Sequence, residues 1–460
     1  MPVNSFDDYP MSWRPDLSEV TGPKYLALVE LLERDIQSGA LKAGTKLPPQ
    51  RELADFLDLS LSTVSRAFKL CEQKGLISAS VGSGTFVSSD AAAESIFLCE
   101  NPRESMIDMG ALVPLTSSNQ KVKQSMERLL KRPDALNCFS YGISEGSRRQ
   151  REAGASWLRR SGFPADSANV MLAAGGQNAL TAALGALFKS GDKVGTDPLT
   201  YSGVKTAARL LGIHLIDVQC RNDEMTEEGI RYAVQNENIR GLYIIPDFHN
   251  PTAHVMSLKT RRMIARVARE ERLIVIEDGI TNLLLEHPIP PAATFAPERI
   301  VYLSSLSKTV SAGLRTAFLH VPEEHHSAFV ETLYAMNVAL SPLLATTSAE
   351  LIEDGVADAI VAERKRDIAA RNQIVDRVLD GFSVAGAPTS PLRYLRLPEH
   401  FTGKSFEICA QTAGVQVFGA ERFSVGNRPV EKAVRLSVTT PPSEALLEEG
   451  VTRLRRLLLQ

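Results

Sequence analysis

The chain has 460 residues, of which 44% are hydrophobic and 23% are charged, and its formal net charge is −3. This length exceeds that of one ordinary domain, so two or three domains are expected. No apolar run approaches the length of a membrane span, and the N-terminus lacks the basic region and apolar core of a signal peptide. The five cysteines are scattered and never form a Cys-x-x-Cys pair. Their spacing argues against a disulfide framework or a zinc site and indicates a reducing compartment, the cytoplasm.

The first patterned segment, residues 24–87, predicts three helices. Apolar residues recur at helical spacing from Tyr25 to Ile36, and this predicts an amphipathic helix. A second, short helix is expected from Arg51 to Leu57. Ser62 is placed to cap a third helix. The apolar face of that third helix contains Val64, Ala67, Phe68 and Cys71.

Two short helices joined by a tight turn form a helix-turn-helix. The second helix of that motif enters the major groove of DNA, with its first residues near the base edges. Hydrogen-bonding side chains occupy those positions here: Ser62, Thr63, Ser65 and Arg66. The stretch 75–87 alternates like a hairpin that turns at 82–84. The pattern alone leaves open a second interpretation, a small helical cap on an enzyme.

Ordered motifs across this segment resemble the winged helix-turn-helix of GntR-type transcription regulators. They are Leu47-Pro-Pro-Gln-Arg-Glu-Leu-Ala54, Leu61-Ser-Thr-Val-Ser-Arg-Ala67, Gly75-Leu-Ile and Gly82-Ser-Gly-Thr-Phe-Val87. The resemblance implies that residues 20–88 bind double-stranded promoter DNA. It assigns DNA contacts to Arg51, Ser62, Thr63, Ser65 and Arg66, and a wing to Gly82, Ser83, Gly84 and Thr85. Leu61 stands where the family often has Arg, so a bidentate contact from Arg to guanine is not expected there.

The rest of the chain predicts a linker and an α/β domain. Residues 89–105 belong to a stretch that begins small and polar without periodicity, which is typical of a linker. Within residues 106–460, β-rich runs at 242–245, 273–276 and 300–303 are separated by helical stretches such as 258–269. This alternation predicts a mostly parallel sheet. Ligands of such sheets gather at the carboxyl ends of the strands.

Lys308 follows the strand-like run 300–303 and is the most informative candidate residue. A lysine that is desolvated at the end of a buried strand has a lowered pKa, and its neutral amine can attack a carbonyl. The hydroxyls of Ser305 and Ser307 and the cation of Arg315 lie close in sequence. This set suits an aldehyde cofactor that carries a phosphate.

Further candidates follow other predicted strands or open helices. Gly176 and Gln177 lie in a turn that opens a helix over 178–188, where free N–H groups and the helix dipole attract a phosphate. Asn250 lies just beyond the end of one predicted strand, and Asp278 ends another. A carboxylate against a pyridine nitrogen keeps it protonated. Tyr201 offers a flat face for stacking. On a strand at 433–438, Arg435 is able to bind a carboxylate through two hydrogen bonds. The His325–His326 pair has no spaced partners, so no metal site is expected.

Taken together and in chain order, these residues resemble those of the fold-type-I aminotransferases, which bind pyridoxal 5'-phosphate (PLP). The resemblance implies that Lys308 is the catalytic lysine bonded to PLP, with Asp278 on the ring nitrogen and Asn250 on the ring hydroxyl. It further implies stacking by Tyr201 and a substrate or effector carboxylate on Arg435. The implied phosphate ligands are Gly176, Gln177, Ser305 and Arg315, with Tyr141 reaching the phosphate of the partner subunit.

Two positions depart from the aminotransferase pattern. The family usually has a Tyr three residues after the cofactor Asp, whereas this chain has the shorter Thr281. Ala253 replaces the last Gly of the Asn-Pro-Thr-Gly motif. The missing tyrosine weakens control of the cofactor's protonation, so at most a weak aminotransferase activity is expected.

The combination of both domains resembles the MocR subfamily of bacterial regulators. It implies a cytoplasmic, head-to-tail homodimer that binds promoter DNA and senses PLP or a small amino compound, with no membrane contact. One alternative is a working aminotransferase with an accessory DNA-binding arm. Another is a scaffold that has lost its cofactor, which the presence of Lys308, Asp278 and Asn250 disfavours.

Overall fold

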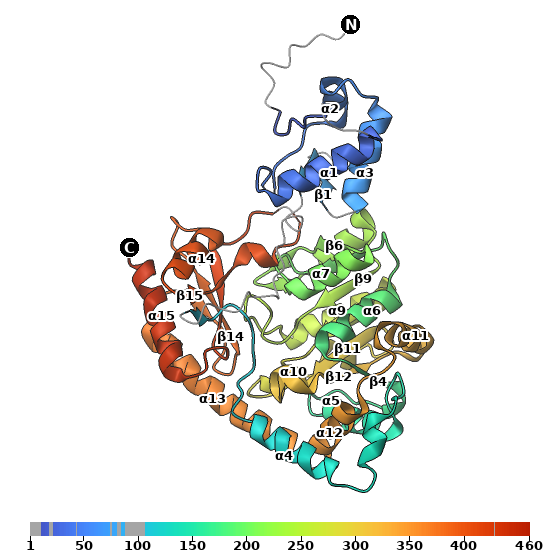
Figure 1. Cartoon of the computed structure of the whole chain (residues 1–460), viewed down its shortest axis with the longest axis vertical. Coiled ribbons are helices and arrows are strands. Elements are labelled where there is room, and N and C mark those ends of the chain that lie inside the picture. Colours follow the sequence, from blue (N-terminus) through green and yellow to red (C-terminus); the bar gives the residue numbers. More distant parts are fainter. Residues whose placement is uncertain are drawn as a thin grey trace.

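The computed structural model describes residues 11–17, 22–42, 44–73, 76–80, 84–87, 106–426 and 428–460. They form a small N-terminal domain, blue in Figure 1, and a large domain, teal to red. The linker expected over 89–105 lies outside the described residues, as do Gly82 and Ser83 of the expected wing.

The N-terminal domain consists of three helices and one hairpin: α1 (Lys24–Gln37), α2 (Gln50–Phe56), α3 (Leu61–Gln73), β1 (Ile77–Ser80) and β2 (Gly84–Val87). β1 and β2 pair antiparallel, with Ile77 opposite Val87. The predicted apolar face of α3 is buried in the core of this domain. Met11 and Trp13 add to the core, and the Trp13 indole donates to Asp35 Oδ2 at 3.0 Å. The three helices and the hairpin are therefore confirmed.

The predicted cap of the third helix is wrong by two residues. α3 begins at Leu61, and the hydroxyl of Ser60 accepts a hydrogen bond from the Thr63 N–H at 3.2 Å. A capping side chain must precede the helix to reach the free N–H groups of its first turn. Ser62 already lies inside that turn, and its hydroxyl contacts the Ser60 hydroxyl at 2.9 Å.

A seven-stranded sheet forms the centre of the large domain. Its strand order is β4 (Val170–Ala173), β12 (Ala317–His320), β11 (Ile300–Ser305), β10 (Ile274–Asp278), β9 (Gly241–Ile244), β5 (Lys193–Thr196) and β6 (His214–Asp217). β12 runs antiparallel to both neighbours, while the strands from β11 to β6 are parallel. The predicted, mostly parallel sheet is thus confirmed, and the three β-rich runs correspond to β9, β10 and β11.

Helices cover both faces of this sheet (Figure 1). Successive strand residues point to opposite faces, so Leu242 and Val275 belong to one apolar cluster and Tyr243 and Ile276 to the other. The first cluster includes residues of α5 (Arg148–Arg159), α9 (Leu258–Glu270) and α12 (Pro342–Glu353). The second includes residues of α6 (Gly176–Leu187), α7 (Ser202–Leu211) and α11 (His326–Asn337). The remaining helices before the C-terminal lobe are α4 (Asn119–Leu130) and the short α8 (Glu227–Tyr232) and α10 (Leu306–Thr309).

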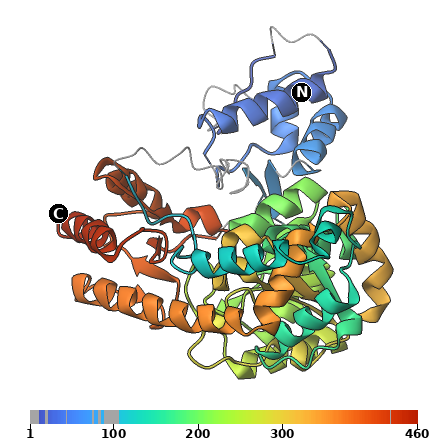
Figure 2. The same cartoon turned by 60° about the horizontal axis from the view of Figure 1, so that its bottom comes forward.

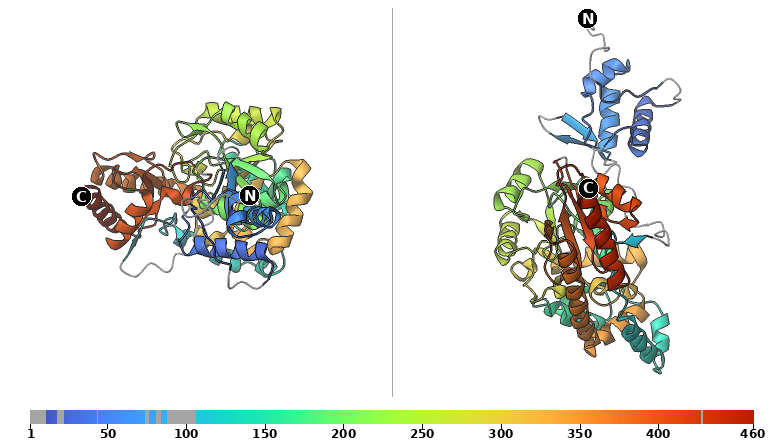
Figure 3. Two further views of the ribbon diagram at one scale, coloured as in Figure 1. Left: turned by 90° about the horizontal axis from the view of Figure 1, so that it is seen from above. Right: turned by 90° about the vertical axis from the view of Figure 1, so that its left-hand side faces the viewer.

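A C-terminal lobe completes the large domain. Its four-stranded sheet has the order β13 (Val384–Ala385), β14 (Leu392–Arg396), β17 (Ala433–Ser437) and β16 (Phe418–Gly419). The long helix α13 (Val356–Val378) leads into it from α12 (Figure 2) and lies beside α15 (Glu444–Leu458) (Figure 3). α14 (Gly403–Thr412) packs against β16. The lobe also holds β15 (Val415–Gln416), which pairs with β3 (Ile107–Asp108) from the start of the large domain.

Within the described ranges, no helix is both long and apolar enough to cross a membrane. The same residues contain no group of three or more His, Cys, Asp or Glu side chains arranged to hold a metal ion.

Candidate functional site

A cavity opens at the carboxyl ends of β9, β10 and β11, between the large sheet and the C-terminal lobe. Five of the residues predicted from the sequence line it together, although up to 234 positions separate them: Tyr201, Asn250, Asp278, Lys308 and Arg435. Parallel strands bring their carboxyl ends to one edge of a sheet, which explains how these distant residues meet.

Lys308 lies in α10, directly after β11. Its Nζ donates a hydrogen bond to the Leu112 carbonyl. Burial lowers the pKa of Lys308 to about 8, the nearby cations Arg435 and Arg315 act in the same direction, and Asp278 opposes them. A larger fraction of this amine is therefore neutral at physiological pH than for an exposed lysine, as nucleophilic attack on a carbonyl requires.

Asp278 and Glu277 end β10 but point to opposite sides of the sheet. Asp278 faces the cavity and accepts hydrogen bonds from the Tyr243 hydroxyl at 2.8 Å and the Ile280 N–H at 3.3 Å. Burial raises the pKa of Asp278 to about 6, against the opposing effect of the Tyr243 hydrogen bond. Glu277 accepts from two backbone N–H groups, of Ala292 and Ala293, each at 2.8 Å. Glu277 therefore caps a short helical turn, and only Asp278 serves the cavity.

Tyr243 was not among the residues predicted for the site. Its hydroxyl is the side-chain donor to Asp278, and the phenol is fully buried in β9. Burial raises the pKa of Tyr243 well above its ordinary value, so the phenol stays protonated and remains a donor. The only signal in the sequence was a single tyrosine within the otherwise aliphatic run Leu242–Ile245.

Arg435, on β17, is 4% exposed. Its Nη1 donates to Asn250 Oδ1 at 2.7 Å, and its Nη2 donates to the Gly110 carbonyl. The guanidinium lies over the Phe423 ring, 4.8 Å from the centroid. Burial lowers the pKa of Arg435 to about 10, so the group stays charged at neutral pH. Both of these hydrogen bonds go to neutral oxygens, which leaves a buried cation suited to an anionic ligand.

Tyr201 lines the cavity and is hydrogen-bonded to Gln177. The Tyr201 hydroxyl donates to Gln177 Oε1 at 3.1 Å, and Gln177 Nε2 donates to the Gly203 carbonyl at 3.0 Å. Burial raises the pKa of Tyr201 above its ordinary value. Gln177 belongs to α6, which begins at Gly176, two residues before the start expected from the sequence.

The N-terminus of α6 faces Arg315. Arg315 Nη2 donates to the Ala174 carbonyl at 3.3 Å, and its Nη1 contacts the Ser307 hydroxyl at 3.5 Å. Gly175 precedes the helix with a φ of +88°, and a Cβ at this position would lie 2.5 Å from Arg315 Nη2. Only glycine fits between the guanidinium and the backbone. The corner combines a cation with the free N–H groups of a helix start, the features that bind a phosphate.

Ser305 and Ser307 have different surroundings. The Ser305 hydroxyl donates to the Thr316 carbonyl and accepts from the Ser307 N–H, each at 3.2 Å, so it caps α10. The Ser307 hydroxyl contacts Arg315 instead. Ser307 is thus a second hydroxyl at the phosphate-type corner, although the family resemblance assigned only Ser305 to the phosphate.

Thr281, which replaces the family tyrosine, is buried and faces the backbone. Its hydroxyl donates to the Asp247 carbonyl at 2.7 Å. This hydrogen bond connects the loop after β9 to the turn after β10. It uses the only proton of the Thr281 hydroxyl.

The stretch 107–115, here called the strap, crosses the cavity wall at the start of the large domain. Its carbonyls accept hydrogen bonds from the two cavity cations, at Gly110 from Arg435 and at Leu112 from Lys308. The buried Arg364 of α13 donates to the Leu115 carbonyl at 2.7 Å. The strap is therefore held both by two side chains that face the cavity and by Arg364 of α13.

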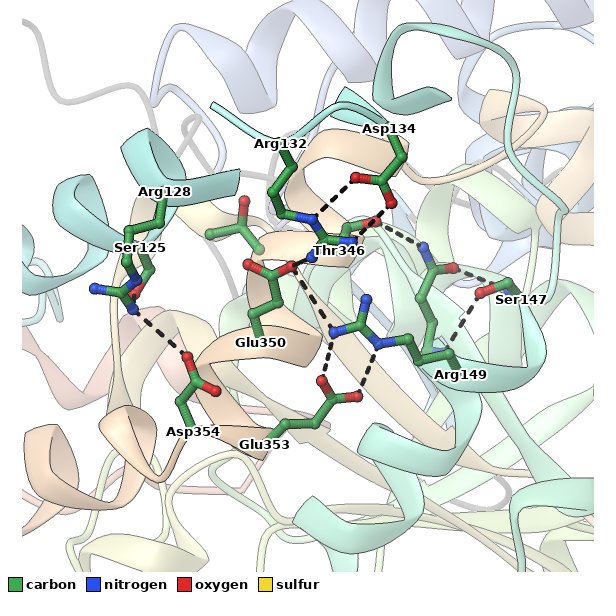
Figure 4. Close-up of polar contacts among 12 residues, drawn as sticks. Ser125, Arg128, Arg132, Asp134, Ser147, Arg149, Thr346, Glu350, Glu353 and Asp354 are labelled. Carbon is green, nitrogen blue, oxygen red and sulfur yellow. Dashed lines mark hydrogen bonds and ion pairs between the residues drawn. The ribbon is translucent and has the colours of Figure 1, made fainter. Parts of the chain in front are cut away.

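Tyr141 lies outside the cavity of its own chain and is 91% exposed. It belongs to a group of exposed apolar residues that we call the apolar ridge: Leu136, Phe139, Tyr141 and Ile143. Ion pairs at both ends fix this segment (Figure 4): Arg132 pairs with Asp134 at 2.7 Å, and Arg149 pairs with Glu353 of α12 at 2.6 Å. Arg132 also pairs with Glu350 of α12, so residues on both sides of the ridge are joined to that helix. Each such surface pair contributes at most about 1 kcal/mol.

In the N-terminal domain, some of the side chains predicted to contact DNA are exposed, and some form hydrogen bonds within the protein. Arg51, Ser62 and Arg66 are exposed, and the Arg66 guanidinium lies 3.9 Å from the centroid of the Tyr25 ring. The Ser65 hydroxyl donates to Gln50 Oε1 at 2.7 Å, and the Thr63 hydroxyl contacts the Ser60 hydroxyl at 2.8 Å.

The hairpin next to these helices carries the remaining predicted contacts. Gly84 begins β2 with a φ of +115°, and a Cβ there would lie 2.8 Å from the Lys46 side chain. Thr85 is half-buried, and its carbonyl accepts from the Leu47 N–H at 2.8 Å. The hairpin is thus fastened to the segment that precedes α2.

Comparisons with known proteins agree with both parts of this structure. Residues 104–454 match the family described as aminotransferase class I and II, and residues 24–87 match the bacterial regulatory proteins of the gntR family. The chain is 44% identical to the HTH-type transcriptional regulator YdeF of Bacillus subtilis, over all of this chain and 99% of that protein. It is 24% identical to the HTH-type transcriptional regulator YjiR of Escherichia coli, over 92% of this chain and 97% of that protein.

A solved structure shares the fold of the large domain. The kynurenine aminotransferase of Pyrococcus horikoshii superposes with a TM-score of 0.71 at 19% identity, over 77% of this chain and 91% of that one. The chain therefore belongs to the aminotransferase class I and II family and, through its GntR-type N-terminal domain, has the architecture of the MocR subfamily of transcriptional regulators.

Proposed function

We propose that this regulator binds promoter DNA through residues 20–88 and uses residues 106–460 to sense PLP, or PLP together with a small amino compound. The observation that carries the proposal is one cavity in which a lysine of lowered pKa and a buried arginine face each other in a chain that also contains a DNA-binding domain.

The residues of the cavity fit each chemical feature of PLP. The amine of Lys308 suits the aldehyde, and Asp278 suits the proton of the ring nitrogen. The glycine cradle under Arg315 at the start of α6 suits the phosphate, with Gly176, Gln177, Ser305 and Ser307 around it. Asn250 would bind the ring hydroxyl, and Tyr201 would stack on the ring. When bound, PLP would supply an electron-withdrawing ring that stabilises negative charge on an attached amino compound.

Arg435 supports an amino compound that also carries a carboxylate. Its Nε has no hydrogen-bond partner among the described residues, and its other nitrogens bond to neutral oxygens. A carboxylate would satisfy this buried cation with charge-assisted hydrogen bonds. An amino acid, or a similar compound with both groups, would present its amine toward Lys308 and its carboxylate toward Arg435.

The strap offers a way for the cavity to influence the DNA-binding domain. Lys308 and Arg435 donate to strap carbonyls, and a ligand that takes over these donors removes those hydrogen bonds. The strap is the first described stretch after the DNA-binding domain in the sequence. Ligand binding would therefore remove contacts between the large domain and the strap. The ligand-free and ligand-bound states would then differ in these contacts, and a switch requires such a difference.

The apolar ridge supports a homodimer. Its four apolar side chains are exposed in the single chain, and a second copy that packs on them would remove this apolar surface from water. In the head-to-tail arrangement, Tyr141 would reach the phosphate corner of the partner. Two DNA-binding domains in one dimer would read two half-sites whose spacing depends on the dimer.

An active aminotransferase with an accessory DNA-binding arm is the competing function. Thr281 weighs against it, because its hydroxyl is bonded to the Asp247 carbonyl and is not free to replace the family tyrosine. We therefore expect slow turnover with common amino donors.

One screen distinguishes the two functions. Amino donors are added to the PLP-loaded protein, and two properties are recorded: conversion of the cofactor to pyridoxamine phosphate, and affinity for the promoter of the chain's own gene. A regulator changes its DNA affinity with at least one donor while turnover stays slow. Rapid multiple turnover without any effect on DNA binding would establish the enzyme instead.

A further inference from the structure

Leu61 is an exposed apolar residue at the start of α3. Its side chain is 41% exposed, and among the large apolar side chains in the described part of the N-terminal domain only Leu26, at 38%, is comparably exposed. Single exposed leucines are common on protein surfaces. The position of Leu61, and not its exposure alone, therefore carries the argument.

α3 has one buried and one exposed face. Leu61, Ser62, Arg66 and Lys69 are exposed, while the opposite face is buried in the domain core. At 3.6 residues per turn, Leu61 lies about 80° around the helix from Lys69 and about 140° from Arg66. Leu61 therefore lies at the edge of the exposed face and at the N-terminal end of the helix, and the two cations lie nearer the middle of that face, where they can meet phosphates.

The polar side chains beside Leu61 already have partners inside the protein. The Thr63 hydroxyl contacts the Ser60 hydroxyl at 2.8 Å, and the Ser65 hydroxyl donates to Gln50 at 2.7 Å. Leu61 is the first residue of the second helix in the helix-turn-helix, and first-turn residues of that helix lie near base edges. The group that this helix presents first is therefore apolar.

A leucine has no hydrogen-bond donor or acceptor in its side chain. The feature of a base pair that it can recognise in the major groove is the C5-methyl group of thymine. We propose that Leu61 contacts a thymine methyl in each operator half-site and determines specificity at that position. The proposal rests on DNA binding through this domain and adds the identity of one base to it.

The test removes one methyl group from the DNA. Full-length, PLP-loaded protein selects its operator from a randomised duplex library, and each selected thymine is then replaced by deoxyuridine. At one thymine per half-site we expect binding to weaken about fourfold, the effect of withdrawing one buried methyl-sized group. In Leu61→Ala, the difference between thymine and deoxyuridine at that position should disappear.

Two further variants sharpen the result. Leu26→Ala removes the other exposed leucine in the described part of the domain, on α1, and should leave the thymine preference intact. Leu61→Arg should shift the preference at the same position toward guanine, because Arg pairs with the acceptors of that base. Both positions are exposed, so the core of the domain is unchanged in either variant.

The outcomes separate this inference from the proposed function. If the protein selects an operator but the parent and Leu61→Ala discriminate thymine from deoxyuridine equally, Leu61 is not the specificity residue, although DNA binding stands. Half-sites without a thymine would overturn the inference in the same way. If no duplex is selected at all, the assignment of DNA binding fails together with it.

Discussion

Arg435 donates a hydrogen bond to Asn250 across 2.7 Å, and this contact joins the C-terminal lobe to the loop that follows β9. Both residues line the cavity, so a ligand bound beside this contact touches both lobes.

Replacing Arg435 should separate effector sensing from cofactor binding. Arg435→Ala should keep PLP bound, because Arg435 is not part of the phosphate corner and Lys308 is still present, but lose the response to an amino acid, since losing a charged clamp costs ~2–5 kcal/mol. The measurement is operator affinity with and without the amino acid, alongside the cofactor spectrum. Arg396→Ala is the matched control, because Arg396 lies on the adjacent strand and pairs with the exposed Glu431 at 2.6 Å. A full response in Arg435→Ala would remove this residue from the effector site.

Borohydride reduction should attach PLP to Lys308 alone. Lys205 serves as an internal control, because it is a buried lysine whose Nζ donates to the Ser424 carbonyl at 2.7 Å. Peptide mapping after reduction should find the cofactor on Lys308 and not on Lys205, and Lys308→Ala should lose the visible absorbance. Label on Lys205, or unchanged absorbance in Lys308→Ala, would contradict the assignment.

PLP uptake by the apo-protein should depend on the pKa of Lys308. Because only the neutral amine attacks, the uptake rate should rise with pH through a midpoint near 8. Arg435 lowers this pKa, so Arg435→Gln should move the midpoint to higher pH. Stopped-flow absorbance over a pH series measures both curves. Coincident midpoints in the two proteins would show that the Arg435 charge does not act on the lysine.

Asp278 should reduce the stability of the apo-protein at neutral pH. Its folded pKa is raised to about 6 from 3.8, so ionisation is less favourable in the folded state than in the unfolded state. Asp278→Asn should therefore stabilise the apo-protein by about 1–3 kcal/mol at pH 8, an advantage that shrinks as the pH falls through 6 and vanishes below about 4. Thermal unfolding of both apo-proteins across this range tests the difference. PLP binding should weaken in the same variant.

Arg51 should contribute a phosphate contact to DNA binding. Arg51→Ala should weaken operator binding and flatten its salt dependence, because each phosphate contact contributes about −0.9 to the log–log slope. Arg34→Ala provides the comparison, since Arg34 is an exposed arginine of α1 that lies 3.4 Å from Asp35. Equal salt slopes for the parent and Arg51→Ala would exclude the contact.

The residues at strand ends were predictable because their neighbours in sequence define them. Asn250, Asp278 and Lys308 each follow an apolar run, and parallel pairing then brings the three together without further information. Arg435 was found on its strand for the same reason. The sequence does not show the hydrogen-bond partners of these side chains. Gly110 and Arg435, for example, meet only when β17 is paired and the strap is in place.

Details that depend on register were missed. Tyr243 reaches Asp278 because β9 pairs with β10 so that Tyr243 is opposite Ile276, two residues before the carboxylate. The choice between Ser305 and Ser307 at the phosphate-type corner depends on which hydroxyl caps α10. The true cap of α3, Ser60, differs from Ser62 by half a helical turn, which hydrophobic periodicity does not resolve. Such differences are smaller than the spacing that sequence patterns detect.

The strap also limits how the two domains can be recombined. A chimaera that gives this sensor a different DNA-binding domain must be joined before residue 106, because Ala111 and Leu112 line the cavity and the carbonyls of Gly110 and Leu112 accept hydrogen bonds from its two cations. A junction within 107–115 would graft foreign backbone into the ligand site and change its selectivity along with its output. Junctions on the N-terminal side of the strap would exchange the recognised DNA sequence and keep the sensor's chemistry.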